Sequence, residues 1–438
     1  MQLTFSEQAK RAIDLVENTK KNVFITGKAG TGKSTLLEHL RLNSARKMIV
    51  LAPTGVAAIN VKGDTIHSFF GLKPGFELDE AREKKVRDER AKKYLNLKTI
   101  CIDEISMVRA DILDAVDVFL RKARKNENPF GGVQMIFFGD LYQLPPVVTS
   151  SDRDRFFSEY SSPYFFDAQV FQGANNLLDE KFEMEFVELD KIYRQKDDDF
   201  ISILNAVRNN AMTEKDLLKL NTRYDPDFVS RKEENYIHLM TTNANAATVN
   251  SKKLQEIEED EVFFSANVKG KLARNLQPND TEVTVKIGAQ IMFINNDMHR
   301  RWVNGTIGKI VDIQSKYNEE LGDTETVLFV EKLCGKVVEV KTHTWEISKY
   351  VFKGGQFERE KMGSFRQIPL KLAWAITIHK SQGKTFEKVV IDLGSGSFAH
   401  GQTYVALSRC TSLDGIVLRR PFRESDIIMD RRVENFHE

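Results

Sequence analysis

The sequence contains few cysteines and no long apolar run. Its three cysteines, Cys101, Cys334 and Cys410, lie far apart, with no CxxC pair and no histidine nearby at ligand spacing. This pattern indicates neither a disulfide framework nor a zinc site, and it is typical of a reducing compartment. No stretch approaches the roughly 18 to 20 apolar residues that a membrane span requires, and residues 1–10 lack a signal-peptide core. We therefore expect a cytoplasmic protein, nucleoid-associated if bacterial, with no membrane partner.

The sequence also lacks an excess of charge of one sign. Lys and Arg number 64 against 63 Asp and Glu, which leaves a net charge of +1. Because nucleic-acid binding depends on a local basic groove rather than on total charge, the composition does not identify the partner. The 438 residues, of which 41% are hydrophobic and 29% charged, predict two or three soluble globular domains.

A glycine-rich segment is the most informative motif. Residues 27–34 read GKAGTGKS, after the apolar run Val23–Thr26 and before a helix-compatible stretch, Thr35–Asn43. This context is typical of a phosphate-binding loop, in which glycines let backbone N–H groups and a helix N-terminus approach the anion. Lys33 would then reach the β- and γ-phosphates of ATP, and Ser34 would supply a hydroxyl to Mg²⁺. The predicted nucleotide-binding residues of this loop are Gly27, Gly30, Thr31, Gly32, Lys33, Ser34 and Thr35.

Short β-branched runs alternate with helical stretches through the first 190 residues, which predicts a buried parallel sheet and an α/β fold. A second α/β unit begins near Asp190. Alternating apolar and polar residues from about Asp297 to Gln367 predict a small antiparallel barrel inserted into it. The charged segment 79–93 predicts an exposed helix, either merely solvated or part of a small functional subdomain.

These patterns give expected strands and domain boundaries. The strands of the first unit are expected at Val23–Thr26, Met48–Ala52, Thr99–Asp103, Gln134–Phe138 and Phe182–Leu189. Those of the second unit are expected at Tyr236–Met240, Lys388–Leu393 and Gly415–Leu418. The first domain is expected at 1–71 and 98–189 with an insertion at 72–97, and the second at 190–296 and 369–438 with the barrel at 297–368.

Polar side chains follow two of the expected strands. Asp103 and Glu104 end the apolar strand TICIDEI, and the carboxyl edge of a parallel sheet lies beside a phosphate loop. Asp103 would hold Mg²⁺ with Ser34, and Glu104 would orient and deprotonate the attacking water. The next strand ends in GDLYQLPPV, where two prolines would hold Gln143. Gln143 would either contact the γ-phosphate or the water, or belong to a plain turn.

Two arginines of the second unit have two possible roles. Arg194 lies in KIYRQ and Arg409 in VALSRC. Each is either a surface arginine or a group that neutralises developing phosphoryl charge, an effect worth on the order of 10³ or more in rate. The residues alone leave both possibilities open.

A family resemblance rests on motifs that occur in one order along the chain: GKAGTGKS, LAPTGVAA with GDTIHSFF, IDEISMV, GDLYQLPPV, YRQ, AITIHKSQGKT and YVALSRC. Together they resemble superfamily 1 helicases, specifically the superfamily 1B PIF (petite integration frequency) family of 5′-to-3′ DNA helicases. The resemblance spans about Thr4 to Leu418. It implies two RecA-like P-loop domains, a small inserted subdomain in the first and a small SH3-like β-barrel inserted in the second. It also implies ATP bound between the domains, with Lys33, Asp103, Glu104, Gln143, Arg194 and Arg409 as catalytic residues.

The resemblance further implies base and DNA contacts. Gln8, in FSEQAKRAI, matches a glutamine that reads adenine, although a helix-surface glutamine is the alternative. Hydroxyl and amide groups at loop ends suit contacts with phosphate oxygens, and His67 or Phe69 could stack on a base. Core packing is the alternative for Phe69. The implied DNA-binding residues are Thr54, His67, Phe69, Thr242, Asn243, His379, Lys380, Ser381 and Gln382.

The sequence is therefore interpreted as an ATP-dependent 5′-to-3′ DNA helicase that translocates on single-stranded DNA and unwinds duplex or structured DNA. Its expected cofactors are ATP and Mg²⁺, its expected partners are single-stranded DNA and single-strand/duplex junctions, and a monomer is expected in the absence of DNA. One alternative is a DNA-stimulated ATPase and translocase that acts as the motor subunit of a recombination complex, with weak unwinding. Another is a nucleotide-switched binding module without hydrolysis, which the presence of Glu104 and both arginines disfavours.

Overall fold

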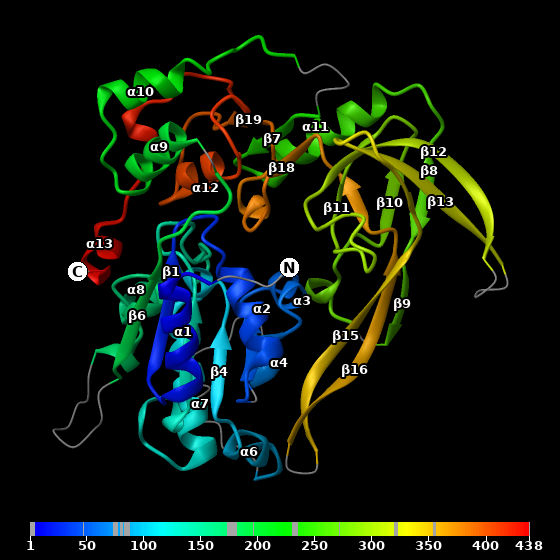
Figure 1. The fold of residues 1–438 in the computed structure, drawn as a ribbon. Coiled ribbons are helices and arrows are strands. Elements are labelled where there is room, and N and C mark those ends of the chain that lie inside the picture. The colour runs from blue at the N-terminus through cyan, green and yellow to red at the C-terminus, as the bar shows by residue number, and fades with distance from the viewer. Residues whose placement is uncertain are drawn as a thin grey trace. The chain divides into compact units, whose positions relative to one another are not determined.

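The computed structural model describes residues 5–46, 48–72, 78, 82, 88–172, 182–195, 197–229, 235–270, 272–318, 323–353 and 356–437. The chain forms two compact units (Figure 1). Unit 1 comprises Met1–Tyr193, Ile347–Met362 and Arg431–Glu438, and unit 2 comprises Arg194–Glu346 and Gly363–Asp430. In the part of the chain that is described, no helix has the length and apolar character to cross a membrane.

A six-stranded parallel sheet forms the centre of unit 1, in the order β3-β2-β4-β5-β1-β6. The five predicted strands are confirmed, each within two residues of its expected bounds. The two-residue strand β3 was not predicted because it is too short to give a pattern. The strands are β1 (Asn22–Gly27), β2 (Met48–Ala52), β3 (Asp64–Thr65), β4 (Thr99–Ile102), β5 (Gln134–Phe138) and β6 (Met184–Leu189).

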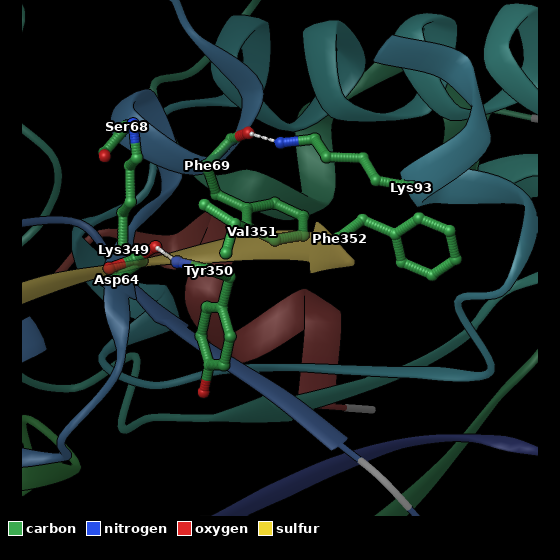
Figure 2. A pocket seen from close by; sticks show the side chains of 8 residues that line it. All are labelled: Asp64, Ser68, Phe69, Lys93, Lys349, Tyr350, Val351 and Phe352. Carbon is green, nitrogen blue, oxygen red and sulfur yellow. Dashed lines mark hydrogen bonds between the residues drawn. The ribbon is translucent and has the colours of Figure 1, made fainter. Parts of the chain in front are cut away.

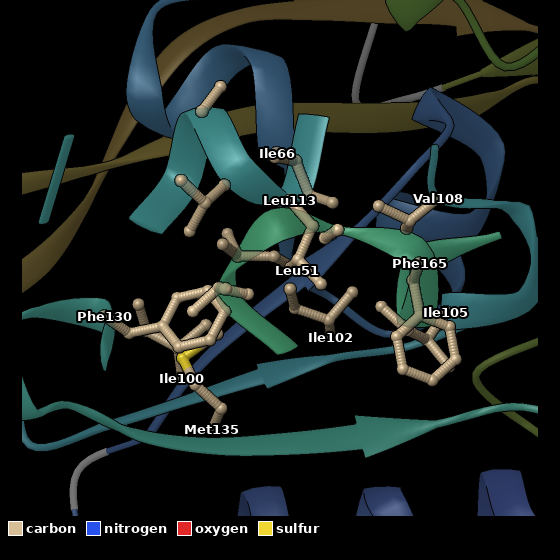
Figure 3. Close-up of a cluster of buried hydrophobic side chains, with 14 of the residues drawn as sticks. Leu51, Ile66, Ile100, Ile102, Ile105, Val108, Leu113, Phe130, Met135 and Phe165 are labelled. Atoms are coloured by element: carbon tan, nitrogen blue, oxygen red, sulfur yellow. The ribbon is translucent and has the colours of Figure 1, made fainter. Parts of the chain in front are cut away.

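Helices cover both faces of this sheet, because successive strand residues point to opposite sides. Val23 and Ile25 of β1 pack in one apolar cluster with α1 (Glu7–Asn18) and α2 (Lys33–Asn43). Phe24, between them, packs in the other cluster with α7 (Ala110–Arg124). Figure 3 shows side chains from the second cluster, contributed by β2, β4, β5 and α7. Near-continuous apolar strands are therefore explained by burial on both faces.

Five shorter α-helices lie in the described part of unit 1. The last of them packs the half-buried Phe436 against the core beside β1 and β6, with its ring centroid 4.4 Å from that of Phe166 and 5.4 Å from that of Phe186. Residues Arg431–Glu438 thus group with unit 1. The five helices are α3 (Gly55–Asn60), α4 (Ile66–Phe70), α6 (Asp88–Leu95), α8 (Arg153–Glu159) and α13 (Arg431–His437).

A second parallel sheet lies in unit 2, in the order β18-β7-β19-β20. The three predicted strands are confirmed, and β18 was missed. The α/β fold class with two parallel sheets is therefore correct. The strands are β7 (Ile237–Met240), β18 (Ala375–Thr377), β19 (Val389–Asp392) and β20 (Ile416–Leu418), and the helices are α9 (Asp198–Arg208), α10 (Glu214–Asn221), α11 (Asn243–Gln255) and α12 (Gln402–Ser408).

Antiparallel strands are inserted between β7 and β18, as predicted, but they begin at Val262 rather than near residue 297. They form sheets in the orders β14-β13-β12-β11-β17, β15-β16-β9 and β10-β8. The predicted domain boundaries and the SH3-like character of the insertion stay predictions. The strands are β8 (Val262–Ser265), β9 (Asn267–Gly270), β10 (Glu282–Val285), β11 (Gln290–Phe293), β12 (Ile307–Asn318), β13 (Asp323–Lys332), β14 (Val337–Val340), β15 (His343–Lys353), β16 (Gln356–Gln367) and β17 (Leu370–Leu372).

The charged segment predicted as an exposed helix, residues 79–93, lies largely outside the described residues. Its described part is Arg82 and the start of α6.

Candidate functional site

The glycine-rich loop joins β1 directly to α2 in unit 1. Gly27, Gly30 and Gly32 have φ values of 148°, 84° and 87°. Residues with a Cβ rarely adopt this backbone conformation. A Cβ at Gly27 would lie 2.6 Å from the Leu189 carbonyl oxygen. Gly32 is the N-cap of α2 and carries no side-chain cap, so the first N–H groups of this helix face the loop. This geometry suits a bound polyphosphate.

Lys33 lies folded back onto this loop. Its Nζ donates to the carbonyl oxygens of Gly27 at 2.5 Å and Lys28 at 3.1 Å. Thr31 Oγ1 also donates to the Lys28 carbonyl, at 2.9 Å. The Lys33 ammonium group is therefore held beside the loop by two backbone carbonyl oxygens. Phosphate oxygens would replace these carbonyls as its hydrogen-bond acceptors.

Asp103 and Glu104 follow β4, as the sequence predicted. Burial and the adjacent Glu104 carboxylate raise the pKa of Asp103 to about 7, although Lys33 opposes this rise. Glu104 adopts a left-handed conformation with φ 50° and ψ 46°. Two half-buried carboxylates side by side repel each other, and a divalent cation would relieve that repulsion. Ser34, Asp103 and Glu104 thus have the donor types that Mg²⁺ prefers.

Gln143 is held by Asp140, a residue that the sequence analysis did not single out. Gln143 Nε2 donates to Asp140 Oδ2 at 3.0 Å, and the Tyr142 N–H donates to Asp140 Oδ1 at 3.2 Å. Both side chains are buried. The carboxylate therefore orients Gln143, a role that the sequence analysis gave to the two prolines. An aspartate two residues after β5 and three residues before a glutamine was the available signal.

Two further side chains of unit 1, Gln8 and Tyr193, have contacts that bear on nucleotide binding. Gln8 Nε2 donates to Asp190 Oδ2 at 2.8 Å. The Tyr193 N–H donates to the Gly30 carbonyl oxygen at 2.9 Å, and a Cβ at Gly32 would lie 3.7 Å from the Tyr193 ring. The Tyr193 side chain is 51% exposed. An exposed ring against a phosphate loop suits stacking on a nucleotide base, and the sequence analysis missed it.

Arg194 and Arg409 belong to unit 2, where both contact the end of α12. Arg194 NH1 donates to the Ser408 carbonyl oxygen at 3.1 Å. Arg409 is 1% exposed, and its Nε donates to the Val405 carbonyl oxygen at 2.9 Å. Its NH1 donates to the carbonyl oxygens of Ser381 and Lys384, each at 3.3 Å. Arg409 is therefore bonded to the loop that carries HKSQG.

The predicted DNA contacts of unit 1 lie on α3 and α4. Thr54 caps α3 by accepting from the Ala57 N–H at 3.2 Å, and burial lowers the pKa of His67. Phe69 is 2% exposed, and its ring lies 5.7 Å from that of Tyr94 and 6.1 Å from that of Tyr350. Phe69 therefore packs in the core, and stacking on a base would require it to leave this cluster.

A cavity of about 300 Å³ lies beside Phe69 (Figure 2). At its wall the Tyr350 N–H donates to Asp64 Oδ2 at 2.8 Å, and Lys93 Nζ donates to the Phe69 carbonyl oxygen at 2.8 Å. Burial raises the pKa of Asp64. These contacts fix the segment that carries His67 and Phe69. The lining residues are Asp64, Ser68, Phe69, Lys93, Lys349, Tyr350, Val351 and Phe352.

The predicted DNA contacts of unit 2 follow two neighbouring strands. Thr242 and Asn243 come after β7, and residues 379–382 come after β18. Because β7 and β18 are parallel neighbours, both segments lie at one edge of the sheet. Ser381 is fully buried and donates from Oγ to the Ile378 carbonyl at 2.6 Å, whereas Lys380 is exposed. Among the described residues, the buried Gln382 Nε2 has no hydrogen-bond partner.

A family model described as PIF1-like helicase matches residues 4–217. The curated ATP-dependent DNA helicase Pif1 of Bdellovibrio bacteriovorus is 34% identical over 447 residues, which covers 100% of this chain and 92% of that protein. The chain belongs to the PIF1-like helicase family. The rat ATP-dependent DNA helicase PIF1 is 35% identical to this chain over 95% of the chain's length. The chain spans 61% of the length of that relative.

Solved structures from this family share the fold. The structure of Bacteroides Pif1 in complex with ADP-AlF4 is 36% identical with a TM-score of 0.88, and covers 100% of this chain and 97% of that one. The structure of Bacteroides Pif1 bound to single-stranded DNA has the same identity and coverage with a TM-score of 0.67.

Proposed function

We propose that this chain is an ATP-dependent DNA helicase that couples ATP hydrolysis to 5′-to-3′ movement along single-stranded DNA. The phosphate loop that faces the Asp103–Glu104 pair carries this proposal, because that arrangement suits hydrolysis of a nucleoside triphosphate. Membership of a family whose curated members are named ATP-dependent DNA helicases supports the choice of reaction. The direction of travel follows from the resemblance alone.

ATP would bind through contacts that unit 1 already holds in place. Tyr193 would stack on the base, and Gln8, fixed by Asp190, would donate to it. Lys33 would exchange the Gly27 and Lys28 carbonyls for β- and γ-phosphate oxygens. This exchange retains charge-assisted hydrogen bonds, so the loop needs little rearrangement.

Ser34 and Asp103 would hold Mg²⁺, which when bound would neutralise charge on the phosphates. Glu104 would accept a proton from the attacking water, because its carboxylate follows Asp103 at the end of β4. Gln143, oriented by Asp140, would contact that water or the γ-phosphate. These roles follow from the chemistry of the residues at the loop.

Arg194 and Arg409 would add positive charge at the phosphates during hydrolysis. In the present structure Arg409 bonds the carbonyl oxygens of Ser381 and Lys384. If Arg409 instead contacts a phosphate, the carbonyl oxygens of Ser381 and Lys384 lose a hydrogen-bond donor. The conformation of the HKSQG loop can then change. Hydrolysis would thereby alter the DNA contacts of the same unit.

DNA would bind through its phosphates at the edge formed by Thr242, Asn243 and residues 379–382, which suits tracking without sequence preference. Single-strand/duplex junctions are the proposed sites of action. The chain would be a monomer in the absence of DNA, and its molecular mass measured by sedimentation analysis tests this oligomeric state.

ATP hydrolysis measured with and without single-stranded DNA tests the function. We expect strong stimulation by unstructured strands of unrelated sequence. Lys33→Ala should abolish turnover at unchanged thermal stability, and Lys215→Ala, an exposed lysine on α10, serves as the matched control. Turnover at the wild-type rate in Lys33→Ala, or no response to DNA, would contradict the proposal.

A further inference from the structure

A buried glutamine of unit 2, Gln195, holds the backbone beside one of the two arginines. It follows Arg194 in KIYRQ and precedes α9, which packs against α12. The Gln195 side chain is 3% exposed. Its Nε2 donates to the carbonyl oxygens of Ser408 at 3.2 Å and Cys410 at 3.0 Å. Because these residues come immediately before and after Arg409, one amide group fixes the chain on both sides of that arginine.

The backbone of Arg409 is fixed at its own carbonyl as well. The Phe386 N–H donates to the Arg409 carbonyl oxygen at 2.9 Å. Residues 408–410 therefore offer three consecutive carbonyls that accept hydrogen bonds from donors distant in sequence. The Arg409 side chain adds a bond from NH2 to Ser408 Oγ at 2.8 Å. The guanidinium can thus exchange its own partners while the backbone that carries it stays in place.

Capping of α12 does not account for both bonds of Gln195. The last carbonyls of a helix have no partner within the helix and need donors from elsewhere. The Ser408 carbonyl already accepts from Arg194 NH1 at 3.1 Å, and Cys410 lies two residues beyond the end of α12. Gln195 uses the second lone pair of the Ser408 carbonyl and reaches past Arg409 to the next one. This arrangement suits the orientation of Arg409 more than the termination of a helix.

We propose that Gln195 is a positioning residue for ATP hydrolysis, which sets the direction in which the Arg409 side chain leaves the backbone. The inference rests on the proposed function, in which Arg409 adds positive charge at the phosphates. A displacement of about 1 Å in a group that acts on the reacting phosphate can cost roughly 100-fold in rate. Gln195 would therefore influence kcat through Arg409, without a contact of its own to the nucleotide.

The test is steady-state ATP hydrolysis by the full chain with saturating single-stranded DNA, measured well below the Tm of every variant. Gln195→Met removes both hydrogen bonds and keeps a side chain of similar length. We expect kcat to fall about 10-fold or more while the KM for ATP stays within about 3-fold of the wild-type value, because the proposed contacts that bind ATP lie in unit 1.

Gln290→Met is the matched control. Gln290 is also buried in unit 2, and its Nε2 donates to the carbonyl oxygens of Tyr236 and Ala373, each at 2.9 Å. Each methionine variant loses two hydrogen bonds of the same kind, so both should lower Tm, by roughly 2 to 12 °C. Gln290→Met should nevertheless keep kcat within about 2-fold of the wild-type value, because its amide holds no residue beside Arg409.

A double-mutant cycle shows whether Gln195 acts through Arg409. In the Arg409→Lys background the guanidinium is already absent, so its orientation no longer matters. Adding Gln195→Met to Arg409→Lys should then lower kcat by less than about 2-fold.

Three results would each overturn the inference while leaving the proposed function in place. They are a wild-type kcat in Gln195→Met, an equal loss of kcat in Gln290→Met, and the full effect of Gln195→Met in the Arg409→Lys background. Should Gln195→Met fail to fold, as judged by thermal unfolding, Gln195→Asn decides the question by the same criteria, because it keeps the amide but is too short to reach both carbonyls. A wild-type chain that hydrolyses no ATP in the presence of DNA would instead remove the proposed function itself.

Discussion

Asp103→Asn should stabilise the nucleotide-free protein while abolishing ATP hydrolysis. Burial and the Glu104 carboxylate raise the pKa of Asp103 from 3.8 to about 7. A rise of this size corresponds to about 4 kcal/mol of unfavourable free energy when Asp103 is ionised. Solvent near the half-buried group screens part of the repulsion, so we expect a gain in unfolding free energy of about 1 to 3 kcal/mol. Asparagine has nearly the same shape and can still accept the Glu104 N–H.

The effect has a defined pH dependence. Because the pKa of Asp103 is higher in the folded protein than its ordinary value of 3.8, the folded protein binds more protons between about pH 4 and pH 7. Its unfolding free energy therefore falls as the pH rises through this range. The stabilisation by Asp103→Asn should be full at about pH 8 and absent at about pH 4, where the carboxyl group is neutral in both states.

Thermal unfolding measures this prediction directly. For a unit of about 200 residues, a gain of about 1 to 3 kcal/mol raises Tm by roughly 2 to 12 °C. Asp154→Asn, at an exposed position on α8, is the control and should leave Tm unchanged. An Asp103→Asn variant with an unchanged or lower Tm at about pH 8 would refute the reasoning that burial and the Glu104 carboxylate together disfavour an ionised Asp103 in the folded protein.

Three further predictions concern other parts of the chain. Tyr193→Ala should raise the KM for ATP about 10-fold with a smaller effect on kcat, because base stacking is lost; steady-state kinetics measure this, and an unchanged KM would remove Tyr193 from the nucleotide site. Phe436→Ala should lower the unfolding free energy by about 2 kcal/mol and Tm by roughly 4 to 8 °C, since its ring packs on Phe166 and Phe186. Phe398→Ala, at a 63% exposed ring, is its control, and equal Tm changes in the two variants would contradict the core role of α13. Arg409→Lys should lower kcat by about 100-fold or more and change the affinity for single strands without nucleotide, because lysine cannot bond the carbonyls of Val405, Ser381 and Lys384 together. Wild-type values of both quantities would exclude Arg409 as the link between hydrolysis and DNA.

The sequence predicted those features that depend on local pattern. The β1, β4 and β5 strands are continuous apolar runs because both faces of the sheet are covered, and glycine spacing identifies the phosphate loop. The position of Asp103 and Glu104 at the end of β4 was predicted because the apolar run before them marks the strand and where it ends.

Features that depend on contacts distant in sequence were not predicted. The α13 helix returns to unit 1 through Phe436, and no local signal in a seven-residue helix identifies that destination. Tyr350 packs against Phe69 across more than 280 residues, which buries a side chain that the motif GDTIHSFF suggested for base stacking. The role of Asp140 depends on a hydrogen bond to Gln143 that spacing alone does not specify.

Strand separation with defined tails distinguishes a 5′-to-3′ helicase from an ATPase that does not unwind duplex DNA. Two duplexes, identical except for a single-stranded 5′ tail or 3′ tail, are incubated with the chain, ATP and Mg²⁺. We expect ATP-dependent unwinding of the 5′-tailed duplex, none with Lys33→Ala, and little with the 3′-tailed duplex. Preference for the 3′ tail would contradict the direction of travel, and ATP hydrolysis without unwinding of either duplex would contradict the assignment as a helicase.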